Sequence, residues 1–289
     1  MLVLLDGSKL AEVVYSYARE LSGRLNLAVD ILHVCRPEEE DQLPMRQAYV
    51  NHMAEMFRAK TEGGSAQTLG QVVIGYPAEE ILKYVGKNQI DIIMLATHGV
   101  SGIRRWGLGS VADKIIHETD VPIWLVPSFL HETILNDSSA SRSILIPLDG
   151  SKLAESVISP VKELVKQRGV DMDLVLVNVI NQPVVAYSYW GNSPPLVGEN
   201  LTALRTESQV YLNNLVQTLK SEGFSARSEQ LAGIPAEEIV RYASEYQPRL
   251  IAMTTHGRSG LNRFVFGSVA ENVLRRLQKT PLFLVKPRD

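Results

Sequence analysis

The chain has 289 residues, of which 45% are hydrophobic and 21% are charged, and its formal net charge is −3. This composition is typical of a globular protein with buried cores, and the charge offers no basic field for nucleic acid or for an anionic membrane. The single cysteine, Cys35, excludes a disulfide within the chain and fits a reducing compartment. The apolar run at residues 1–5 stops at Asp6, too early for a signal segment or a membrane span. We therefore expect a cytoplasmic protein with no nucleic acid and no membrane among its partners.

Blocks of sequence recur in the same order along the chain. LLDGSKLAE (4–12) returns as PLDGSKLAE (147–155), GYPAEEIL (75–82) as GIPAEEIV (233–240), and VPIWLV (121–126) as TPLFLV (280–285). The offset grows from 143 residues (149 − 6) at the first block to 158 (233 − 75) at the second, which indicates an insertion in the second copy around 186–200. We predict a tandem duplication of a whole domain, with domain 1 at 1–128, a polar linker at 129–141 and domain 2 at 142–289.

Strand and helix patterns alternate within each copy. In the second copy the strand patterns are 142–149, 173–180, 226–232, 249–255 and 281–286, and the helical patterns between them are 151–169, 201–223, 234–246 and 268–277. Strands that alternate with helices favour parallel pairing, right-handed crossovers and a doubly wound sheet. The sequence therefore predicts an α/β fold of two tandem doubly wound domains, each with a mostly parallel sheet of five strands and helices on both faces. Ligands of such sheets bind beyond the carboxyl ends of the strands.

One loop after a fourth strand is spelled twice, as ATHGVSGIRRWGLGS (96–110) and TTHGRSGLNRFVFGS (254–268). A glycine after Thr-His is followed, nine residues later, by Gly-Ser and a helical pattern: Gly99, Gly109 and Ser110 in the first copy, and Gly257, Gly267 and Ser268 in the second. Glycine permits close backbone approach, and a helix start presents N–H groups and partial positive charge. The pattern predicts a phosphate-binding loop. The alternative is that each serine only caps its helix.

Other nucleotide motifs are absent from the sequence. No G-x-x-x-x-G-K-[ST] occurs, and no G-x-G-x-x-G follows either first strand, because both of these strands end in Asp-Gly-Ser. Asp6 and Asp149 are expected at the same sheet edge as the repeated loop, where a carboxylate can accept a hydrogen bond from a ribose hydroxyl or an adenine amine. The alternative is that each aspartate caps the following helix.

LDGS near the start of each copy, HGxSG before GSVA, and the spacing G-x2-G-x9-G-[S/T] resemble the universal stress protein (UspA-like) family over almost the whole chain. The resemblance implies five-stranded sheets related to the adenine nucleotide α-hydrolases, with ATP at the strand ends. It also implies that Asp6 and Asp149 lie near adenine and ribose, and that the backbones of Val34 and Val179 meet adenine. The phosphate loops that it implies contain Gly99, Gly109 and Ser110, and Gly257, Gly267 and Ser268.

The chain departs from the family pattern at the first glycine, which is Ala96 in one copy and Thr254 in the other. Alanine adds one methyl group, whereas threonine adds a branched side chain and a hydroxyl. Arg258 could offset this change with charge-assisted hydrogen bonds to a phosphate, at a position where the first copy has Val100. The sequence therefore does not rank the two sites.

The histidines of the repeated loop, His98 and His256, lack the spacing to an acid that a catalytic triad needs, so we expect them to bond the loop backbone. Histidine and cysteine spacing predicts no zinc site. If Mg²⁺ accompanies ATP, phosphates and waters would hold it. We assign no catalytic residue and no metal ligand.

The apolar strands 121–126 and 280–285 are expected at the edge of their sheets, where they would invite pairing. The resemblance implies that such strands pair antiparallel across a dimer interface. A tandem chain can form this contact internally, as a pseudo-dimer of its halves. A further homodimer stays open, with the insertion around Trp190 as one candidate surface.

The leading hypothesis is an ATP-binding universal stress protein that senses or buffers adenine nucleotide and does not turn it over rapidly. One alternative is a slow ATP hydrolase with Asp6 or Asp149 as the base. The other is a scaffold for protein interactions that binds no nucleotide, which the residues Ala96 and Thr254 would favour.

Overall fold

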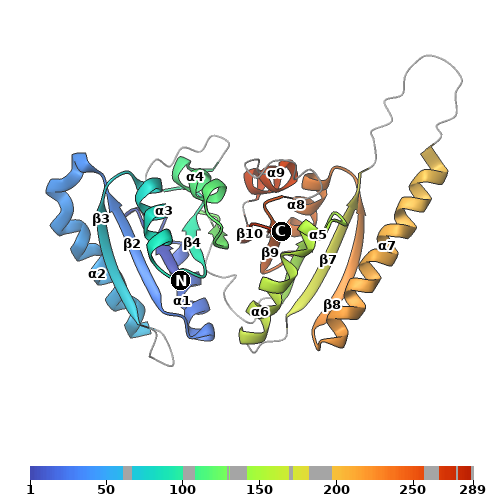
Figure 1. Ribbon diagram of the computed structural model, residues 1–289, viewed down its shortest axis with the longest axis horizontal. Helices are drawn as coiled ribbons and strands as arrows, with labels where there is room; N and C mark the ends of the chain where they lie inside the picture. The colour runs from blue at the N-terminus through green and yellow to red at the C-terminus, as the bar shows by residue number, and fades with distance from the viewer. Residues whose placement is uncertain are drawn as a thin grey trace, which may run out of the picture.

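The computed structural model describes residues 1–60, 67–99, 108–128, 130, 142–168, 172–181, 197–256, 267–277 and 279–287. In this part of the chain, ten strands form one sheet in the order β3-β2-β1-β4-β5-β10-β9-β6-β7-β8, and Figure 1 shows the two halves side by side. The predicted insertion (186–200) lies outside the described residues up to 196, and the predicted linker lies outside them except at Leu130. No described helix is long and apolar enough to cross a membrane.

The two halves have the same order of five strands and intervening helices, except that the first contains an additional 3-10 helix and the second has two helices after its first strand. The first half contains β1 (Leu2–Leu4), α1 (Val14–Leu25), β2 (Val29–Cys35), the 3-10 helix η1 (Pro37–Gln42), α2 (Leu43–Lys60), β3 (Thr68–Ile74), α3 (Pro77–Lys87), β4 (Ile93–Ala96), α4 (Ser110–Glu118) and β5 (Ile123–Val126). The second contains β6 (Ser143–Pro147), α5 (Lys152–Glu155), α6 (Ile158–Arg168), β7 (Asp173–Ile180), α7 (Val197–Ser221), β8 (Ser225–Ala232), α8 (Pro235–Tyr246), β9 (Leu250–Thr254), α9 (Ser268–Arg276) and β10 (Leu282–Val285). All pairs within a half are parallel, which confirms the predicted fold class.

The two halves join through β5 and β10, which pair antiparallel in the centre of the sheet. Trp124 lies opposite Phe283 in the register, and the centroids of their buried rings are 5.9 Å apart. The strands that the sequence predicts as edges therefore bury each other, and the expected internal pairing of the halves is confirmed.

Apolar side chains fill the space on both faces of this sheet. Successive residues of a strand point to opposite faces, so Val3 joins one core while Leu2 and Leu4 join the other. The first core includes residues of α1, α2, α6 and α7, and the second includes residues of α3, α4, α8 and α9. Each core contains residues of both halves, so the packing is continuous across the molecule.

A buried ion pair also joins the halves. The guanidinium of Arg249, just before β9, donates from Nη2 to Glu20 Oε1 of α1 at 2.5 Å, and the two side chains are only 6% and 19% exposed. Near the pairing strands, Lys286 Nζ lies 2.7 Å from Asp120 Oδ1. Burial makes the Arg249 pair sensitive to the loss of one partner, because the remaining charge cannot be well hydrated.

One predicted helix is interrupted. The sequence predicts a single helix over 151–169, whereas the structure has α5 and then α6, with a break at Ser156–Val157. Pro160 explains the break, because proline lacks an N–H and its ring clashes with the carbonyl four residues earlier, here that of Ser156. Pro160 itself is tolerated in the first turn of α6.

A buried polar side chain links the ends of the first two strands in each half. In the first half His33 Nδ1 donates to the carbonyl of Leu5 at 2.9 Å, and in the second Asn178 Nδ2 donates to the carbonyl of Leu148 at 2.7 Å. The carbonyl can only accept, so the proton of neutral His33 lies on Nδ1. Burial lowers the pKa of His33 below its ordinary value. The neighbouring Arg46 lowers this pKa further, while the bond to Leu5 and the charges of Asp6 and Glu39 oppose the shift.

Replacement of the buried arginine should destabilise the protein. We expect Arg249→Met to lower the free energy of unfolding in urea by about 3 kcal/mol, because the ion pair of the buried guanidinium with the partly buried Glu20 is lost. Arg275→Met is the control, since Arg275 and Glu271 form a pair on α9 with side chains 49% and 45% exposed. That variant should lose no more than about 0.5 kcal/mol. Equal losses in the two variants would contradict a special role for the buried pair.

The buried histidine should make stability depend on pH. Since the pKa of His33 is lowered in the folded state, the unfolded chain binds the proton first, and stability is lost as pH falls below the ordinary value of 6.5. His33→Asn reproduces the residue of the second half, Asn178, and removes this titration. Urea unfolding at pH 7.5 and pH 5.5 should show a smaller loss on acidification in the variant than in the wild type. The same loss in both proteins would show that other groups cause it.

Candidate functional site

A cavity of about 240 Å³ lies beyond the carboxyl ends of β6, β7 and β9 in the second half. Among its lining residues are five that the sequence predicts for this site: Asp149, Val179, Thr254, Gly267 and Ser268. Ile239 and Met253 add an apolar wall. Gly257 and Arg258 lie outside the described residues. The structure therefore brings together, in one hollow, candidate residues that are more than a hundred positions apart in the sequence.

The start of helix α9 opens into this cavity. Gly267 is the N-cap and has no side chain with which to cap the helix, and Ser268 is the first helical residue. The N–H of Gly267 donates to the carbonyl of Thr255 at 2.7 Å, and the first intrahelical bond runs from Glu271 N–H to the carbonyl of Gly267 at 2.9 Å. The N–H groups of residues 268–270 therefore have no intrahelical acceptor, and all three residues line the cavity. The alternative that Ser268 serves only as a cap is wrong.

Helix α4 begins in the same way in the first half. Gly109 is its N-cap without a side-chain cap among the described residues, Ser110 is its first residue, and Gly109 N–H donates to the carbonyl of Thr97 at 3.0 Å. Space differs between the two glycines. A Cβ on Gly267 would lie 2.9 Å from the carbonyl oxygen of Thr255, whereas one on Gly109 would lie 3.4 Å from that of Thr97. Close packing thus requires glycine more strictly in the second half.

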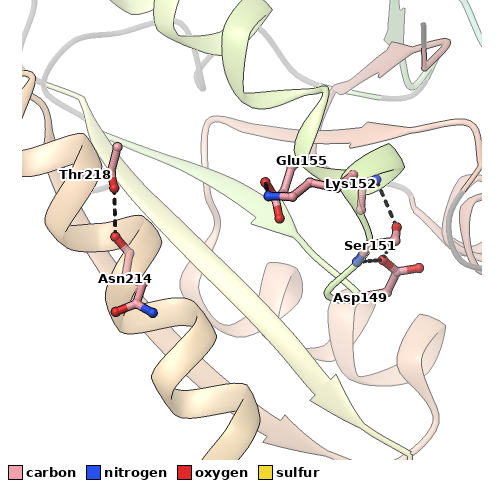
Figure 2. Close-up of polar contacts among 7 residues, drawn as sticks. Asp149, Ser151, Lys152, Glu155, Asn214 and Thr218 are labelled. Carbon is pink, nitrogen blue, oxygen red and sulfur yellow. Dashed lines mark hydrogen bonds and ion pairs between the residues drawn. The ribbon is translucent and has the colours of Figure 1, made fainter. Parts of the chain in front are cut away.

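The aspartate after the first strand orients a serine cap. Asp149 Oδ1 accepts from the N–H of Ser151 at 2.9 Å and from its hydroxyl at 2.6 Å, and the same hydroxyl accepts from the N–H of Ala154 at 3.1 Å (Figure 2). Ser151 is the N-cap of α5, so the alternative that the aspartate caps the helix is wrong. Gly150 between them has φ 85°, a conformation that favours glycine.

The first half repeats this turn. Asp6 Oδ1 accepts from Ser8 N–H and hydroxyl at 2.9 and 2.6 Å, and the hydroxyl accepts from Ala11 N–H at 3.1 Å. The other carboxylate oxygen of Asp6 faces the repeated loop, because a Cβ on Gly99 would lie only 1.9 Å from it. Gly99 is therefore required here by close approach, and the structure places it against Asp6.

The two valines lie where their strands extend beyond a neighbour. The register of β7 with β6 ends at Val177, whereas that with β8 continues to Ile180, so Val179 passes the end of β6 and lines the cavity. In the first half the register of β2 with β1 ends at Leu32, and Val34 passes the end of β1 in the same way. Backbone groups on this side of each valine have no partner in the shorter strand, which gives a physical reason for a ligand contact.

The loop histidines bond to residues beside them. His98 Nδ1 lies 3.0 Å from the hydroxyl of Thr97, and His256 Nδ1 lies 2.8 Å from that of Thr255.

Ala96 is the last residue of β4, and Thr254 is the last residue of β9. Within the described residues, no group of three or more His, Cys, Asp or Glu side chains could hold a metal ion.

Sequence reasoning misses several residues around these loops. Ile239 and Met253 line the cavity but look like ordinary core positions in their helix and strand patterns. Ser128, which follows β5, bonds both the N–H and the carbonyl of His98 at 2.9 Å. Its position carries Pro287 in the second half, so comparison of the two copies does not reveal it.

Comparison with known proteins accounts for both halves. The sequence model of the Universal stress protein family matches residues 1–127 and 140–286. Universal stress protein MJ0531 of Methanocaldococcus jannaschii is 31% identical over 160 residues, which cover 55% of this chain and 91% of that protein. Universal stress protein Rv2005c of Mycobacterium tuberculosis is 20% identical over 298 residues, which cover 95% of this chain and 92% of that protein.

A solved structure shares the full architecture. The crystal structure of a universal stress protein from Archaeoglobus fulgidus superposes with a TM-score of 0.70 at 21% identity, covering 99% of this chain and 97% of that chain. This likeness shows the same fold over both halves. With the family match over most of the chain, it leads to one conclusion: the chain belongs to the universal stress protein family and contains two tandem copies of its domain.

Proposed function

We propose that this chain is an ATP-binding universal stress protein that senses or buffers adenine nucleotide and does not turn it over rapidly. The start of α9, whose N-cap is Gly267 and which opens into a cavity with apolar walls, carries the proposal. Three successive N–H groups and the positive end of the helix dipole favour an anion at this place. The equivalent start of α4 supports the same role in the first half.

The cavity in the second half has a part for each piece of the nucleotide. The apolar side chains of Val179, Ile239 and Met253 suit a base, and the β7 backbone beyond β6 can hydrogen-bond its edge. Asp149 lines the same cavity, where a carboxylate can accept from a ribose hydroxyl. Phosphates would meet the N–H groups of residues 268–270. Mg²⁺, if bound, would be held by phosphates and waters.

The groups that the structure describes at this site suit binding and orientation, and none of these described groups is placed as a nucleophile. Asp149 Oδ1 already accepts two bonds from Ser151, and the ring of His256 bonds Thr255. Such a site suits a protein whose signal is the binding of nucleotide itself. A partner protein would distinguish the bound from the free form. Adenine nucleotide is therefore the proposed ligand of domains 142–289 and 1–128, which the linker 129–141 would join. The cytoplasmic location and a homodimer stay predictions from the sequence.

A negative charge at the start of α9 should separate phosphate binding from helix stability. We expect Ser268→Asp to weaken ATP binding in the second half by about tenfold or more, because the carboxylate repels phosphate. The same carboxylate favours the helix dipole, so the melting temperature should stay the same or rise. Calorimetric titration with Mg-ATP, together with thermal unfolding, measures both effects.

Ser268→Asn is the matched control, since it has a similar size and no charge, and it should bind nearly as the wild type does. Ser110→Asp makes the same test in the first half. Affinity for Mg-ATP unchanged in both aspartate variants would show that phosphate does not lie at the helix starts. A wild-type protein that binds no adenine nucleotide would overturn the proposed function itself.

A further inference from the structure

The carbonyl of the loop histidine is held by a hydroxyl in the first half. Ser128 is 7% exposed, and its hydroxyl donates to the carbonyl of His98 at 2.9 Å. The same oxygen accepts from the N–H of His98 at 2.9 Å and lies 3.3 Å from the hydroxyl of Thr97. Ser128 N–H in turn donates to that threonine hydroxyl at 3.1 Å. The entrance of the first loop is thus tied to the residue that follows β5.

The second half has no serine at this position. Thr97 N–H donates to the carbonyl of Val126, and Thr255 N–H donates to that of Val285, at 2.9 and 3.0 Å, which fixes the correspondence of the two halves. Two residues further along lie Ser128 in the first half and Pro287 in the second. Proline has neither a hydroxyl nor an N–H, so it cannot form this tie.

A different hydroxyl reaches the same atom. Thr254 is 6% exposed, and its hydroxyl donates to the carbonyl of His256 at 2.6 Å. The equivalent residue of the first half is Ala96, which has no hydroxyl. Among the described residues, a hydroxyl thus donates to the histidine carbonyl in each half, from a different place in the chain: after β5 in the first half, and at the end of β9 in the second.

We propose that Thr254 is a positioning residue of the second site, and that its hydroxyl replaces the one that Ser128 supplies in the first. The inference rests on the proposed function for its link to nucleotide, while the exchange of hydroxyls stands on the contacts alone. The threonine in place of the family's first glycine then compensates for Pro287, which has no hydroxyl, and the second site keeps its ability to bind nucleotide.

The tie acts on the helix start through one peptide unit. Thr255 O accepts from Gly267 N–H at 2.7 Å, and the next carbonyl, that of His256, accepts from Thr254. The two ends of the repeated loop are therefore joined at residues 255–256, beside the N–H groups of α9. Loss of the Thr254 hydroxyl removes this bond to the His256 carbonyl and loosens the position of Gly267 relative to β9.

Four variants test the role of Thr254. Thr254→Val keeps the shape and removes the hydroxyl, and Thr254→Ser keeps the hydroxyl. Thr254→Ala introduces the residue of the first half, and Thr254→Ala with Pro287→Ser copies the arrangement of the first half. The first readout is hydrogen exchange of the Gly267 N–H without nucleotide. The second is the affinity of the second site for Mg-ATP, measured in a Ser110→Asp background that weakens the first site.

We expect Thr254→Val and Thr254→Ala to exchange about tenfold faster at Gly267 and to bind Mg-ATP about tenfold more weakly, as the loss of one buried hydrogen bond would cause. Thr254→Ser and the Thr254→Ala, Pro287→Ser double variant should lie within about twofold of the parent. The reciprocal pair in the first half, Ser128→Ala and its rescue by Ala96→Thr, repeats the test at Gly109 if a second-half variant fails to fold.

The outcomes separate the two proposals. Wild-type exchange at Gly267 in Thr254→Val, or no rescue by either hydroxyl-bearing variant, would overturn the positioning role. If exchange follows the expected pattern while the wild-type protein binds no nucleotide, the positioning role is supported and the proposed function fails.

Discussion

The antiparallel pairing of β5 with β10 is the contact on which the rest of the structure depends. Each half is a parallel sheet whose last strand is short and apolar, and such a strand needs a partner on its open side. Because the two halves are one chain, they meet at high effective concentration, and the seam closes within the molecule. Trp124 and Phe283 then extend one core across both halves, and the Arg249–Glu20 pair makes the arrangement specific.

Parallel pairing within each half brings chemistry to one edge. All carboxyl ends of the strands in a half point the same way, so the turn after β6, the end of β7, the loop after β9 and the start of α9 meet there. Polar groups of this edge hydrogen-bond to one another: Asp149 accepts from the hydroxyl of Ser151, and the hydroxyl of Thr254 donates to the carbonyl of His256. Side chains locked in this way keep the helix start open, because no side chain among the described residues turns back to cap it.

The fold follows from the sequence because its signals are periodic and repeated. Alternating strands and helices predict the parallel sheet, and the second copy of each block repeats the same order of strand and helix patterns. The broken helix at Ser156–Val157 shows the limit of periodicity, since Pro160 preserves the apolar spacing while it removes a backbone bond. Within the candidate site, glycines and aspartates are visible in the sequence because both copies contain them. Ser128 is not, and the sequence identifies Thr254 without the bond that its hydroxyl makes, because a hydrogen bond is set by distance in space and each copy supplies the donor from a different place in the chain.

Duplication explains why such exchanges are tolerated. A buried carbonyl that loses its donor is costly, so a change at one position is retained only where another group reaches the same atom. This holds for the loop entrance, where Ser128 accompanies Ala96 in the first half and Thr254 accompanies Pro287 in the second. It also holds for His33 and Asn178, whose different side chains bond equivalent strand-end carbonyls in the two halves. The two copies thus differ in residue identity while the backbone of the loop entrance keeps its bonds. What both halves keep is the bond that joins the start of the last helix to the residue after the fourth strand, from Gly109 to Thr97 and from Gly267 to Thr255.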